Sequence, residues 1–161
     1  MSRPASRDRP DGDAPDPVLV SGRIEQSFTT GDLREFPRRT LRCTVECASG
    51  ERTTAEWTGA PVEDLLAAAD APPETTHVRV HARDGYRACI PAVAALDGVL
   101  ADTRDGTLLS ETSQYRTRFL APGVDGARLA KGVTELECLT VDPGEDIDRL
   151  ETLALDDPGF E

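Results

Sequence analysis

Residues 40–57 read TLRCTVECASGERTTAEW and predict the first element of the fold. Apolar and polar side chains alternate through the first eight residues, which is typical of a strand with one buried face. Ser49-Gly50 follows as a turn signal, and residues 52–57 form a second run suited to a strand. We therefore expect an antiparallel hairpin at this point of the chain. One face of its first strand contains Leu41, Cys43, Val45 and Cys47.

Five segments outside the hairpin also have the composition and alternation of strands. They are residues 18–25, 76–82, 86–90, 116–121 and 133–141. The second and third of these segments are joined by Asp84-Gly85, which is a turn signal.

Helices are expected to be few and short. A proline begins residues 61–69, and apolar side chains then recur at helical spacing. The same pattern recurs in residues 91–100, while Thr29 or Thr30 can cap a short turn through Leu33. Strands with dispersed helices and no regular strand–helix alternation predict an α+β domain, built mainly from mixed β-sheet.

The chain has 161 residues, and 30 acidic against 18 basic side chains give a formal net charge of −12. This balance argues against binding to nucleic acid or to an anionic membrane surface, because both need a basic patch. No apolar run approaches the roughly 20 residues that span a bilayer. Every basic residue except Lys131 is arginine, and such a composition suits a salt-rich cytoplasm. We therefore expect an acidic, halophilic cytoplasmic protein.

Length and composition predict one folded domain with flanking segments. Residues 1–17 are rich in Pro, Asp and Arg, lack an apolar signal-peptide core, and are expected to be a disordered arm. Residues 18–142 are expected to form the domain, and residues 143–161 an acidic tail. Within that tail, one helical turn could place Ile147, Leu150 and Leu153 against the body.

Four stretches match one known pattern in the same order. The cysteine strand that ends at Cys47 leads to residues 55–66, AEWTGAPVEDLL. Residues 84–91, DGYRACIP, contain a tyrosine-bearing strand, and residues 105–109 read DGTLL. Residues 118–133, RFLAPGVDGARLAKGV, complete the set. On these residues the chain resembles the molybdopterin-binding domain of sulfite-oxidase-type oxidoreductases, which implies the mainly β, mixed-sheet fold of that family.

The resemblance also implies a molybdopterin cofactor, a pterin dithiolene that holds molybdenum. It assigns Cys47 as the metal ligand, and a soft thiolate suits this role. Tyr86 falls on the tyrosine of the family's substrate pocket, where a phenol can hydrogen-bond an oxyanion. Arg118 and Lys131 fall on residues that hold the cofactor or its phosphate. We expect Arg128 to add a further cation.

The implied function is an oxidoreductase that performs two-electron oxygen-atom transfer or reduction on a small-molecule or oxyanion substrate. No haem or iron–sulfur ligand set is visible, so electrons would pass to a separate carrier protein. An alternative is a non-catalytic module that keeps the fold but binds a pterin or a partner through a degraded site. This alternative stays open because Gly132 replaces the family's Trp after Lys131, and because Ser113-Gln114-Tyr115 replaces the segment with a His that the family has just before Arg118.

The candidate residues also have purely structural interpretations. Cys47 could be a small buried hydrophobe, and Arg118 could pair with one of many carboxylates. A zinc site made from Cys43 and Cys47 is disfavoured, because the two lie ~13 Å apart on an extended strand. His77 and His81 are expected to be surface or edge residues, since no zinc-finger spacing includes them.

Overall fold

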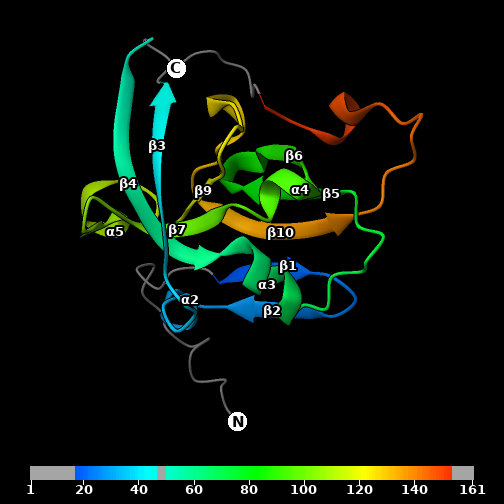
Figure 1. The fold of residues 1–161 in the computed structure, drawn as a ribbon, viewed down its shortest axis with the longest axis horizontal. Coiled ribbons are helices and arrows are strands. Elements are labelled where there is room, and N and C mark those ends of the chain that lie inside the picture. The colour runs from blue at the N-terminus through cyan, green and yellow to red at the C-terminus, as the bar shows by residue number, and fades with distance from the viewer. Residues whose placement is uncertain (1–16, 47–49, 154–161) are drawn as a thin grey trace.

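The computed structural model describes residues 17–46 and 50–153, and their strands form two sheets (Figure 1). The strands of the first sheet are β1 (Val18–Ser21), β2 (Glu25–Phe28), β5 (His77–Ala82), β6 (Arg87–Pro91) and β10 (Val133–Leu139). Those of the second are β3 (Arg39–Glu46), β4 (Arg52–Pro61), β7 (Val99–Arg104), β8 (Thr107–Leu108) and β9 (Arg118–Leu120). The first sheet has the order β2-β1-β10-β5-β6, and the second runs β3-β4-β7-β8 with β9 also paired to β7.

Short helices connect and cover these strands. They are α2 (Thr30–Leu33), α3 (Val62–Ala68), α4 (Ala92–Ala95) and α5 (Leu109–Thr112). Single 3₁₀ turns lie at Arg83–Gly85, Gly126–Arg128 and Ile147–Leu150. Within the described ranges, every helix is too short or too polar to cross a bilayer.

The mixed first sheet confirms the expected α+β, mainly β architecture. β1 runs parallel to β10, whereas β1–β2, β10–β5 and β5–β6 are antiparallel. α3 packs against β1 of one sheet and β4 of the other, so it helps join the two. One continuous apolar core lies between these elements and removes its side chains from water. Its fully buried members include Val20, Leu65, Val80, Leu100, Phe119 and Leu136.

The hairpin expected at residues 40–57 is confirmed by the pairing of β3 with β4. The two strands run antiparallel from the Arg39–Gly59 pair to the Glu46–Arg52 pair, while residues 47–49 lie outside the described residues. The expected cap at α2 is also present. The Thr29 hydroxyl accepts from the Asp32 N–H, and the Asp32 carboxylate accepts from the Thr29 N–H.

Two of the expected elements are wrong in extent. Residues 18–25 are not one strand, because the chain turns at Gly22, where a side chain would meet the backbone of Ala69. The helix expected over residues 91–100 ends at Ala95, and its last residues instead begin β7. Gly98 marks this break, since a Cβ there would lie 2.7 Å from the Leu120 carbonyl oxygen.

Candidate functional site

Arg118 is a buried cation on β9, a strand held between two neighbours. Its backbone pairs with Ala101 of β7 on one side and forms an isolated antiparallel bridge with Lys131 on the other. The side chain is only 6% exposed, and its Nε donates to the carbonyl oxygen of Leu129 at 3.0 Å. Arg118 therefore brings a guanidinium into the interior beside the backbone of Lys131.

Trp57 on β4 lies beneath this cation. The guanidinium carbon of Arg118 is 5.3 Å from the indole centroid, and that of Arg104 is 5.5 Å away, both in the range of cation–π contacts. Among the described residues, the buried Nε1 of Trp57 has no hydrogen-bond partner. A buried indole N–H normally finds an acceptor, so this donor is consistent with a ligand that the chain itself does not supply.

Tyr86 follows the 3₁₀ turn at Arg83–Gly85 and is half-buried. Burial raises the pKa of its phenol, the charges of Asp125 and Glu151 raise it further, and those of Arg128 and Arg118 oppose the rise. The net pKa is raised, so the hydroxyl stays protonated and can donate a hydrogen bond.

Arg128 is held by two carboxylates. Its Nε and Nη2 donate to the two carboxylate oxygens of Glu151 at 2.8 and 2.7 Å, and its Nη1 donates to Asp125 at 3.0 Å. Glu151 has a side-chain exposure of 4% and also accepts from the Cys89 N–H at 2.7 Å. Its own segment is tied to β6 by the Arg87–Thr152 bridge, in the orange-to-red part of the chain in Figure 1. Sequence reasoning missed Glu151, because 23 residues separate it from Arg128.

A Glu151→Gln variant is expected to lower the free energy of unfolding by about 1–2 kcal/mol, because it removes a charged partner from a hydrogen-bonded pair. Burial raises the pKa of Glu151, but its hydrogen bonds from Arg128 and Cys89 lower it by more, and the net pKa lies below its ordinary value. The pair therefore stabilises the protein above the ordinary carboxyl pKa of about 4.3, and this contribution is lost as the pH falls through the lowered value.

Urea denaturation at several pH values measures this difference. Glu145→Gln in the same segment is the control, since Glu145 is exposed and only its backbone N–H has a hydrogen bond within the described residues. If the difference in unfolding free energy between wild type and Glu151→Gln were the same at pH 3 as at neutral pH, the stabilising role of the ionised Glu151–Arg128 pair would be contradicted.

Lys131 and Gly132 complete this part of the site. Lys131 is exposed, next to the buried Arg118 across their bridge. Gly132 has a φ of +69°, and a Cβ there would lie 2.6 Å from Nε of Arg83. The positive φ favours glycine here, and the tryptophan that the family has after the lysine would be strained in this backbone conformation.

Cys47, the expected metal ligand, lies outside the described residues. The other three cysteines are free thiols. Burial raises the pKa of each of them, most strongly for Cys89, where burial and the Glu151 charge raise the pKa to about 11. These three thiols therefore stay protonated at neutral pH and are poor metal ligands as they stand.

The described residues fit an anionic, phosphate-bearing organic cofactor. Arg118 and Lys131 provide adjacent cations, Tyr86 provides a neutral donor, and the Trp57 indole provides a buried N–H with no partner in the described part of the chain. Arg128 lies nearby, but its guanidinium is already bonded to Glu151 and Asp125.

A family model described as "Oxidoreductase molybdopterin binding domain" matches residues 17–145. Sulfite oxidase of Gallus gallus is 30% identical over 138 residues, covering 65% of this chain and 30% of that protein. Mitochondrial sulfite oxidase of Homo sapiens is 30% identical over 145 residues, covering 71% of this chain and 27% of that protein. The chain thus spans less than a third of the length of these relatives.

A solved structure shows the same fold. The crystal structure of the sulfane dehydrogenase SoxCD from Paracoccus pantotrophus superposes with a TM-score of 0.72 at 25% sequence identity. The similarity covers 78% of this chain and 38% of that chain. The two sheets and their connections are therefore a sulfite-oxidase-like molybdopterin domain, as the quoted motifs predicted.

Proposed function

Since this chain belongs to the oxidoreductase molybdopterin binding domain family, we propose that it is a molybdenum-dependent oxidoreductase acting by two-electron oxygen-atom transfer or reduction. In this proposal the Cys47 thiolate ligates the metal. Arg118 and Lys131 hold the anionic cofactor, with Arg128 as a further cation, and Tyr86 lines the substrate side.

The observation that supports this most is Arg118 itself. Its guanidinium is 6% exposed and lies over the Trp57 ring, and its backbone pairs with Lys131, so two cationic residues meet beside an indole N–H that has no partner in the described residues. The planar Arg118 guanidinium can donate two hydrogen bonds to one phosphate group. The exposed Lys131 ammonium adds a compact positive charge beside it.

In this proposal the chain's own residues bind the cofactor, orient the substrate and donate hydrogen bonds. When bound, the molybdenum cofactor supplies the two-electron redox chemistry that protein side chains lack. The Tyr86 phenol, kept protonated by burial and nearby carboxylates, donates a hydrogen bond to an oxygen of the substrate. Arg118 adds positive charge that acts on this phenol, whereas the charge of Arg128 is balanced by Glu151 and Asp125. An oxyanion substrate is part of the proposal.

The names of the relatives suggest which substrates to test first. One is a sulfite oxidase and another a sulfane dehydrogenase, so sulfite and related sulfur compounds are the first candidates. In the same proposal, a separate carrier protein exchanges electrons with the molybdenum centre. The protein works in a salt-rich cytoplasm.

Metal and pterin analysis tests the proposal. The chain, produced at high salt in a host that makes the cofactor, is expected to contain molybdenum and extractable pterin in near-equal amounts. A folded protein that contains neither would exclude the proposed function.

Arg118→Gln is expected to lower the pterin content at least tenfold, since the loss of one charge-assisted contact to an anion costs about 1.5–3 kcal/mol. Arg118→Lys should restore part of that content, because it keeps the charge without the planar fork. Arg42→Gln is the matched control, as Arg42 is 72% exposed and pairs only loosely with Glu56 at 3.8 Å. Equal pterin content in folded Arg118→Gln and Arg42→Gln would contradict the role of Arg118.

One observation favours the alternative of a non-catalytic module. Of the three cations expected to hold the cofactor, Arg128 is already bonded to two carboxylates. A module of this kind would retain pterin, or bind a partner protein, without turning over any sulfur substrate. Turnover of sulfite with an artificial electron acceptor would exclude it.

A further inference from the structure

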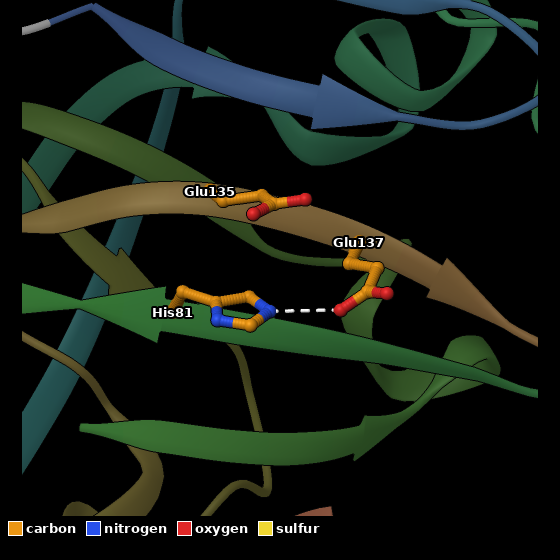
Figure 2. A group of neighbouring side chains, drawn as sticks. All are labelled: His81, Glu135 and Glu137. Carbon is orange, nitrogen blue, oxygen red and sulfur yellow. Dashed lines mark hydrogen bonds and ion pairs between the residues drawn. The ribbon is translucent and has the colours of Figure 1, made fainter. Parts of the chain in front are cut away.

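We infer that His81, Glu135 and Glu137 form a binding site for a divalent transition-metal ion, with Zn²⁺ as the best match. One nitrogen or oxygen atom from each residue lies within 4.8 Å of the other two. Figure 2 shows the three side chains on the same side of neighbouring strands, β5 and β10. This cluster is distinct from the residues assigned to the molybdenum cofactor.

The pairing of the two strands creates the cluster. Glu135 lies opposite His81 in the antiparallel register, and Glu137 follows two residues later on the same side of β10. Side chains two apart on a strand point the same way, so the register brings both carboxylates to the imidazole. The neighbours Leu136 and Val80 point into the core and fix this side as the outer one.

Each carboxylate is held by a donor from outside the cluster. The Ser21 hydroxyl donates to Oε2 of Glu135 at 2.8 Å. Nε and Nη2 of Arg79 lie 3.1 and 3.0 Å from Oε1 of Glu137. Within the described residues, the other oxygen of each carboxylate has no hydrogen bond. Metal-binding carboxylates are commonly oriented by such second contacts. The oxygen of Glu137 that faces His81 is Oε1, so an ion between these two side chains would share this oxygen with Arg79.

The charge of the cluster suits a cation. The two carboxylates and the Arg79 guanidinium together contribute a formal net charge of −1. His81 Nε2 lies 2.8 Å from Oε1 of Glu137 and donates to it, because a carboxylate only accepts. On binding, the imidazole proton moves to Nδ1 and Nε2 becomes a ligand.

The ligand set selects the metal. One imidazole nitrogen and two carboxylate oxygens, with a fourth position for water, match the mixed nitrogen and oxygen coordination of Zn²⁺. Ligand atoms of a tetrahedral zinc ion lie about 3.4 Å apart, given bonds of about 2.0–2.2 Å. The distances between the three ligand atoms, now up to 4.8 Å, must therefore shorten when zinc binds. Rotation of these partly exposed, outward-facing side chains allows this.

Titration of the purified chain with ZnCl₂ and with CoCl₂ tests this site. We expect one Zn²⁺ per chain and a thermal midpoint that rises with the metal concentration. His81→Gln and Glu135→Gln are each expected to weaken binding at least tenfold. His77→Gln is the matched control, since His77 lies on the same strand but outside the cluster, and its affinity should stay within about twofold of wild type.

The cobalt spectrum separates this site from a cysteine site. Nitrogen and oxygen ligands give only weak visible bands, whereas a thiolate ligand adds intense near-ultraviolet absorption. Each variant is first shown to be folded by its thermal transition without metal. A thiolate-type spectrum, no saturation by about 100 µM free Zn²⁺, or equal affinity in wild type, His81→Gln and Glu135→Gln would each overturn the inference.

Discussion

A Gly59→Ala variant is expected to lose about 3 kcal/mol of folding stability or more, which is a large part of the total for a domain of this size. Gly59 lies on β4 at a register irregularity opposite β7. A Cβ at this position would lie 2.5 Å from Cα of Ala101 and 2.7 Å from the carbonyl carbon of Leu100, and still closer to the carbonyl oxygen of Leu100. All three are backbone atoms, so no side-chain rotation relieves the contact. The two strands must separate instead.

Urea denaturation followed by circular dichroism measures this loss. Gly31→Ala is the matched control, because a Cβ on Gly31 would lie 3.6 Å from the Thr29 hydroxyl, an ordinary contact. Alanine at Gly31, within α2, should leave stability unchanged or raise it by about 0.5–1 kcal/mol. A Gly59→Ala protein as stable as wild type would show that β4 and β7 do not approach as closely as described.

A Cys47→Ser variant is expected to contain less than about one tenth of the wild-type molybdenum. A thiolate is a soft, readily ionised ligand, whereas a serine hydroxyl stays protonated at neutral pH and is a much poorer one. The expectation rests on the proposed assignment of Cys47, and molybdenum analysis of the purified variant measures it.

Two other cysteines provide matched controls for this substitution. Cys43 and Cys138 are partly buried thiols with raised pKa values, so Cys43→Ser and Cys138→Ser should retain the metal. Pterin content is measured in the same samples. Full retention of molybdenum by folded Cys47→Ser would reject thiolate ligation by this residue, and retention of pterin alone would separate cofactor binding from metal ligation.

The locally determined parts of the fold were predictable from the sequence. The β3–β4 hairpin follows from alternation and a turn signal, and the α2 cap follows from Thr29 and Asp32 three residues apart. The helix expected through residue 100 shows the limit of such reasoning. Val99 and Leu100 continue the helical spacing but belong to β7, because pairing with β4 and β9 outweighs periodicity.

Candidate site residues could be proposed from the sequence only at positions that match a motif of the family. The resemblance proposes Arg118, Lys131 and Tyr86 as site residues. The structure pairs the backbones of Arg118 and Lys131 at one bridge, and the roles of all three residues stay predictions. Nothing in the sequence pattern indicated that Glu151 would bond Arg128 or that His81 would meet Glu137. Both contacts join residues far apart in the chain, so only the completed strand pairing and the docking of the last segment create them.

The central place of β10 in the first sheet has a kinetic consequence. β10 pairs with β1 on one side and with β5 on the other, so the sheet joins residues near 20 to residues near 136. The loop between β1 and β10 must close before those contacts stabilise the chain, and such high contact order slows folding. During synthesis, the edges of β1 and β5 that pair with β10 lack this partner until β10 leaves the ribosome. Unpaired strand edges are prone to aggregation, so the late synthesis of β10 lengthens their exposure.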